Sequence, residues 1–262
     1  MTTPGLWTAT MHFFRAHVGR VARSRRTLAC AALAAGPPLL AWTIAHYSRR
    51  IPAESVAVHV GWLLLIQVVT PLCALVLGSA VLAEEIEDRT ISYLLSRPIP
   101  RASILLGRWL AVLAAISALL GTSALLTALA ALHSSAAGPA VDRGIAVPLL
   151  AATLSGGAVY SALFAGAGVV FRHPMIAGLG YAFAIEGFLA NLPGKSQVMT
   201  VQFHLRSLIV GTGSPAWRQV EGFSGSTFVG AGAAATTLAI VLVAALALSS
   251  ARLARKEFVL SA

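Results

Sequence analysis

The sequence has little charge, and this scarcity excludes most soluble classes of protein. Only 11% of its 262 residues are charged, with nine acidic residues against nineteen Lys and Arg, whereas a soluble domain has about 25% charged residues. Hydrophobic residues make up 57% of the chain, and the mean hydropathy is +0.81. This balance is typical of membrane proteins.

Cysteine, metal-ligand and nucleotide motifs are also scarce. Cys30 and Cys73 both fall in apolar runs without a pairing pattern, so we expect no disulfide framework. The seven histidines are scattered, which predicts no metal site. The tripeptide GKS at 194–196 resembles only the end of a phosphate loop, because Leu189 stands where the first glycine is needed. We therefore expect no cofactor and no enzymatic activity in this chain, and any ATP hydrolysis must come from another chain.

Long apolar runs are what the sequence does have. A helix needs roughly 20 apolar residues to cross a bilayer, and period-two alternation is absent, which favours helices over a barrel. We predict an all-α polytopic membrane protein with a single transmembrane domain over 27–262. Its six predicted spans are about 27–47, 58–83, 104–133, 145–171, 175–192 and 227–249.

The placement of basic residues predicts the topology. Thirteen of the nineteen Lys and Arg lie in the amino-terminal segment, the loops after spans two and four, and the tail; six lie on the other side. Positive residues favour the cytoplasmic side, so both termini are expected there, in a multi-pass protein of a bacterial inner membrane. Insertion into the lipid bilayer explains the net charge of +10 without a nucleic-acid partner.

Residues 1–26 have the pattern of an amphipathic helix. Apolar residues recur at four- and three-residue intervals from Trp7 to Val21, while Arg15, Arg23 and Arg26 lie largely off that stripe. A basic amphipathic helix before a span is expected in the cytoplasmic headgroup layer. A frayed cytosolic leader is the alternative.

Two proline sites and one long loop are the other notable features of the predicted spans. Gly36-Pro37-Pro38 is expected to kink or break span one, and Thr70-Pro71 predicts a second kink in span two. Between spans five and six, residues 193–226 include a semi-apolar stretch, Val198–Val210, that is too short to span. We predict a re-entrant or surface-lying helix on the outer side.

Glu186 lies in span five without a charged neighbour within one helical turn. An unpaired carboxylate at that depth costs on the order of 3 kcal/mol. We predict a place for it in the transport pathway or the outer gate, together with Gln67 and Arg206. The structural alternative is a pair with Arg206 or Lys195.

The densest charge of the chain follows span two, in the loop 84–103. Glu84–Arg89 matches the E-E-x-x-x-R pattern of CAAX-type intramembrane proteases, but the later histidine elements that activate water are missing, which ranks a protease last. The segment is acidic at its start and ends at Pro98 and Pro100, as a short amphipathic helix does. It predicts either a contact with a cytosolic partner or a solvated loop helix.

The order of residues in this loop resembles the permease subunit of ABC-2 type transporters. The usual form is close to E-x-x-x-G-T-x-x-x-L-L-S-x-P-x-x-R-x-x-x-x-x-G-K, with Arg89 in place of the glycine and Arg108 in place of the lysine. Residues 181–205 are similar to the NosY-like branch. The six-span layout also agrees along the whole chain.

The resemblance implies a division of labour between chains. Two permease copies, as a homodimer or with a related chain, would bind two cytosolic ATPase subunits that use ATP and Mg²⁺. The segment 84–96 would be the coupling helix of an efflux system, and an anchor that transmits force or a signal without transport is the alternative. The implied coupling residues are Glu84, Glu85, Glu87, Asp88, Arg89, Thr90, Tyr93, Leu94, Ser96, Pro98 and Arg101.

Overall fold

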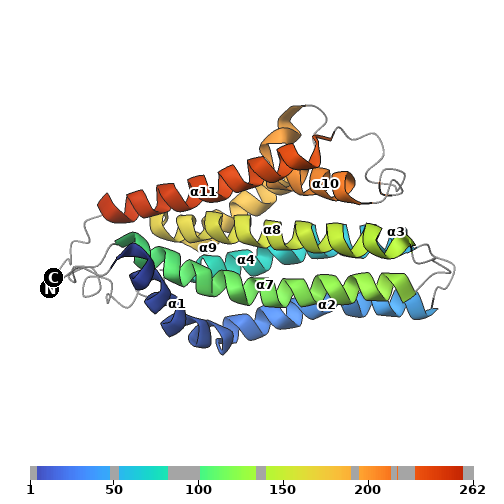
Figure 1. Ribbon diagram of the computed structural model, residues 1–262, viewed down its shortest axis with the longest axis horizontal. Helices are drawn as coiled ribbons and strands as arrows, with labels where there is room; N and C mark the ends of the chain where they lie inside the picture. Colours follow the sequence, from blue (N-terminus) through green and yellow to red (C-terminus); the bar gives the residue numbers. More distant parts are fainter. Residues whose placement is uncertain are drawn as a thin grey trace.

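The computed structural model describes residues 5–47, 53–81, 101–133, 140–189, 195–213, 217 and 228–255, and every regular element within them is helical (Figure 1). The all-helical prediction is thus confirmed. The elements are α1 (Leu6–Ala22), α2 (Arg25–Tyr47), α3 (Ala53–Val56), π-helix η1 (Ala57–Val69), α4 (Thr70–Gly78), α7 (Arg101–His133), α8 (Ala140–Val170), α9 (Pro174–Gly180), π-helix η2 (Tyr181–Leu189), 3₁₀-helix η3 (Lys195–Met199), α10 (Val201–Thr212) and α11 (Ala231–Arg255).

Five of the described helical stretches are long and apolar enough to cross a membrane. They are Arg25–Tyr47, His59–Gly78, Arg101–His133, Gly144–Val170 and Ala231–Arg255. The remaining predicted span coincides with α9 and η2, an apolar stretch over Pro174–Leu189 that is shorter than the others. A multi-pass membrane protein is therefore confirmed, with five full-length spans and one short apolar helix among the described residues.

The helices form an elongated bundle (Figure 1). Helix α7 packs against α1, α2 and α8, while α10 and α11 cover α8 on its other side. The start of α7 and the end of α11 meet at one end of the bundle. Helix α10 lies toward the opposite end, where α2 and α7 terminate.

Small residues allow a close approach between α4 and α8. A Cβ atom added to Gly78 would lie 2.9 Å from the carbonyl oxygen of Ser161, and one added to Gly168 would lie 3.0 Å from the carbonyl oxygen of Ser79. Such contacts drive helix association in lipid, where neighbouring acyl chains are as apolar as the helices. These two helices therefore form a closely packed pair.

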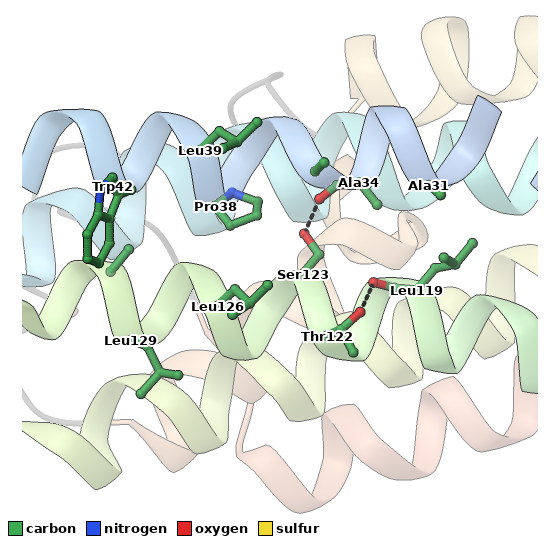
Figure 2. A pocket seen from close by; sticks show the side chains of 12 residues that line it. Ala31, Ala34, Pro38, Leu39, Trp42, Leu119, Thr122, Ser123, Leu126 and Leu129 are labelled. Carbon is green, nitrogen blue, oxygen red and sulfur yellow. Dashed lines mark hydrogen bonds between the residues drawn. The ribbon is translucent and has the colours of Figure 1, made fainter. Parts of the chain in front are cut away.

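Helix α2 continues through Pro37 and Pro38, so of the predicted kink or break in span one the break is wrong and the kink remains a prediction. Proline has no N–H, and Pro38 therefore leaves the carbonyl of Ala34 without its helical donor. The hydroxyl of Ser123 in α7 donates to that carbonyl at 2.6 Å (Figure 2). A donor from a neighbouring helix satisfies the freed backbone group, which lets the helix continue inside a membrane.

Candidate functional site

The predicted coupling segment lies largely outside the described residues. Of its assigned contact residues, the structure describes only Arg101; those from Glu84 to Pro98 fall in the range 82–100. Their contact with an ATPase remains a prediction. The helices that lead into and out of this range are described, however, and they show how it is attached.

Two arginines in the first turns of α7 bind the helix ends that lie beside it. Arg101 Nη1 donates to the carbonyls of Ala254 at 2.9 Å and Leu253 at 3.4 Å, at the carboxyl end of α11. Arg108, only 4% exposed, donates to the carbonyl of Val81 at 3.4 Å, just after α4. An arginine suits the last carbonyls of a helix because the helix dipole is negative there. The start of α7 thus joins α4 to α11.

Helix α1 is packed against the same part of α7. A Cβ atom added to Gly107 would lie 2.6 Å from both the Cβ of Phe13 and the carbonyl oxygen of Thr10. The exposed side of α1 includes Trp7, which is 68% exposed, and Arg15. A helix is thus present where the sequence predicts one, and its position at the membrane interface remains a prediction.

A small basic cavity of about 60 Å³ lies beside these contacts, between α1, α2, α4 and α7. Its walls include His17, Arg20, Ser24, Arg26 and Arg108. The cavity thus gathers basic side chains from α1, α2 and α7 beside Val81, the last described residue before the range 82–100.

At the other end of the bundle, Glu186 caps the amino terminus of α10. Its side chain is 0% exposed. Oε1 accepts from the backbone N–H of Val201 at 2.9 Å and from the hydroxyl of Tyr181 at 2.9 Å, and Oε2 accepts from the backbone N–H of Gln202 at 3.0 Å. The carboxyl group is therefore held at the amino terminus of α10, where the first backbone N–H groups of the helix need acceptors.

Thr200 completes this cap. Its hydroxyl accepts from the backbone N–H of Phe203 at 3.2 Å. The first N–H groups of a helix have no intrahelical partner, and a buried helix end must find them elsewhere. Glu186 and Thr200 together supply acceptors for the first three N–H groups of α10. All ten residues from Val201 to Val210 are buried.

Gln67 is joined to the same helix. Its side-chain Nε2 donates to Oε1 of Gln202 at 3.2 Å, while Nε2 of Gln202 lies 3.5 Å from the backbone carbonyl of Gln67. That carbonyl is four residues before Pro71, which has no N–H to offer it. Pro71 lies just after the change from π-helix η1 to α4 at Thr70, and the kink predicted there remains a prediction.

Helix α10 also places Arg206 close to these groups. Arg206 lies one helical turn beyond Gln202, with its guanidinium 5.4 Å from the ring centroid of Trp62 in η1, a cation–π contact. The structure therefore brings Gln67, Glu186 and Arg206 together through α10. The sequence interpretation missed Gln202, whose signal was an amide in a semi-apolar stretch, and Tyr181.

An apolar groove of about 470 Å³ runs between α2 and α7 (Figure 2). Its two polar residues, Thr122 and Ser123, both donate their hydroxyls to backbone carbonyls. The groove therefore presents hydrocarbon walls. Its other lining residues are Ala31, Ala34, Ala35, Pro38, Leu39, Trp42, Leu119, Leu126, Leu129 and Ala130.

Comparison with known proteins gives one family. The family model described as "ABC-2 family transporter protein" matches residues 8–258, which is nearly the whole chain. No curated protein matches the chain.

Proposed function

The chain belongs to the ABC-2 transporter family, and from this premise we propose that it is the membrane-spanning permease subunit of an ABC exporter. A separate cytosolic ATPase would drive it through the segment 84–96. The observation behind the proposal is the match over residues 8–258, which includes that segment and every described span. We further place the chain in the NosY-like branch, in a bacterial inner membrane with both termini in the cytoplasm.

The described contacts support a mechanical role for the start of α7. Because Arg108 binds the end of α4 and Arg101 binds the end of α11, a displacement of the segment between α4 and α7 would reach three spans at once. The ATPase pair would bind two conformations of a permease dimer with different affinity at different stages of the ATP cycle, and this difference shifts the conformational equilibrium. ATP and Mg²⁺ would bind to the ATPase subunits.

The cluster around α10 is proposed as the outer gate. Glu186, Gln67 and Arg206 meet at a helix that the chain itself buries on all sides. Ionisable residues inside a membrane protein usually line a pathway or hold a moving part. In this proposal the pathway opens on the outer side when α10 leaves its seat, which is the buried position where Glu186 and Thr200 cap its amino terminus.

Co-purification with a soluble ATPase tests the proposal, followed by ATP turnover of the complex in liposomes. Glu87→Ala combined with Arg89→Ala is expected to abolish assembly or ATP-driven turnover, because both charges lie in the segment assigned to the partner. The matched control is Arg255→Ala with Glu257→Ala, which removes the same two charges from the tail. Intact assembly and turnover in the first variant would contradict the coupling assignment.

Transport itself separates the exporter from an anchor. In vesicles whose ATPase faces outward, an anchor subunit would support ATP turnover, but no solute would move into the vesicle lumen. The exporter predicts accumulation of a solute that requires ATP.

A further inference from the structure

A third proline in a described span has a side-chain donor from another segment. Pro148 lies inside α8 and leaves the carbonyl of Gly144 without its helical N–H. The indole Nε1 of Trp217 donates to that carbonyl at 2.8 Å, and the Trp217 side chain is fully buried. This repeats the arrangement at Pro71, where Gln202 lies within reach of the freed carbonyl of Gln67.

Two of the three donors belong to one segment. Gln202 and Trp217, here called the hinge donors, both come from the outer segment 195–217, whereas Ser123 comes from α7. The hinge donors act on η1–α4 and on α8. These are spans two and four, whose α4 and α8 helices form the packed pair described above. One segment therefore supplies donors at the proline sites of both spans in the packed pair.

We infer that Gln202 and Trp217 are positioning residues for transport, which fix the bend of spans two and four until α10 leaves its seat. A proline lowers the resistance of a helix to bending because one backbone hydrogen bond is absent. Inside a membrane the freed carbonyl needs a donor, so the position of that donor selects one bend. Helix α4 leads toward the proposed coupling segment, so a movement that starts there would reach the hinge at Pro71. The inference rests on the proposed function.

The experiment measures an intrachain distance in the full chain. Spin labels are placed at Val170→Cys, at the end of α8, and at Thr212→Cys, at the end of α10; both positions are exposed. Cys30 and Cys73 are buried free thiols and are expected to stay unlabelled. Labelled chain is diluted with unlabelled chain in nanodiscs, and the distance distribution is recorded without nucleotide by pulsed electron paramagnetic resonance.

Gln202→Leu with Trp217→Phe removes both hinge donors. We expect a distance distribution roughly twofold wider than that of the unsubstituted chain, as the pair samples more than one bend. Ser123→Ala is the matched control, because it removes the side-chain donor to the carbonyl of Ala34 that Pro38 frees in α2. It is expected to leave the distance distribution unchanged. A double variant that matches the unsubstituted chain, or a control that widens equally, would overturn the inference. Where the double variant fails to fold, Trp217→Phe alone decides by the same criterion.

A second arm adds the ATPase with ATP and Mg²⁺. The unsubstituted chain is expected to shift its distance on ATP addition, while the double variant hydrolyses ATP with a distance that no longer follows it. A distance in the double variant that still follows ATP as in the unsubstituted chain would also overturn the inference. If no ATPase binds, the proposed function fails, and the nucleotide-free distributions still decide the role of the hinge donors.

Discussion

Replacing Glu186 by glutamine tests the cap of α10 with little change of shape. The carboxylate accepts three hydrogen bonds, and a bond to a charged group contributes about 1.5–3 kcal/mol. Glutamine keeps one acceptor oxygen, and its amide N–H₂ would face the N–H of either Val201 or Gln202. At least one backbone donor is then left buried without an acceptor, so we expect the seated state of α10 to lose about 3 kcal/mol.

Hydrogen–deuterium exchange in nanodiscs measures this loss. Each 1.4 kcal/mol is a factor of ten, so the amides at the start of α10 should exchange roughly 100-fold faster in Glu186→Gln. Tyr181→Phe is the graded control, since it removes one donor and leaves both backbone contacts; its effect should stay within about tenfold. Exchange in Glu186→Gln within a factor of about two of the unsubstituted chain would refute the cap.

Three further substitutions or modifications probe other contacts. Gly107→Ala adds a Cβ atom 2.6 Å from the backbone of α1, so α1 should detach from α7. The arginines of α1 should then become cleavable by trypsin, and unchanged cleavage would contradict the packing of α1 on α7. Arg101→Ala should speed amide exchange in the last turn of α11 by about tenfold, because two carbonyls lose their donor, and Arg101→Lys should recover part of the loss. The Sγ of Cys30 lies 4.0 Å from the carbonyl oxygen of Cys73, and the Sγ of Cys73 lies 3.8 Å from the carbonyl oxygen of Cys30. Oxidation with iodine should therefore form a disulfide between the two thiols. If both thiols can still be alkylated after the treated protein is unfolded, the contact of α2 with α4 is contradicted.

The lengths of the apolar runs predicted the helices well. The run ending at His133 became α7, with a start three residues earlier than expected, and the run 145–171 became most of α8. Burial in hydrocarbon requires an uninterrupted apolar helix of known length, so this signal is local in the sequence. It identifies spans without any knowledge of their neighbours.

The contacts between helices were beyond the reach of local patterns. The carbonyl of Ala34, freed by Pro38, accepts a hydrogen bond from Ser123, 89 residues after Ala34, and the Gln67 side chain bonds to that of Gln202 across 135 residues. Glu186 looked isolated because its partners are backbone N–H groups and a tyrosine, which no pattern of charged side chains reveals. The sequence interpretation found three members of the outer cluster by their polarity, and folding alone joins them.

The seat of α10 also bears on how the protein enters its membrane. The stretch Pro174–Leu189 is shorter than the roughly 20 residues of an ordinary span, and it contains a carboxylate that opposes insertion. The N–H groups that satisfy this carboxylate follow 15 and 16 residues later. During synthesis, α9, η2 and α10 should therefore leave the translocation channel together, so that the backbone N–H groups of α10 bind the Glu186 side chain before lipid surrounds it.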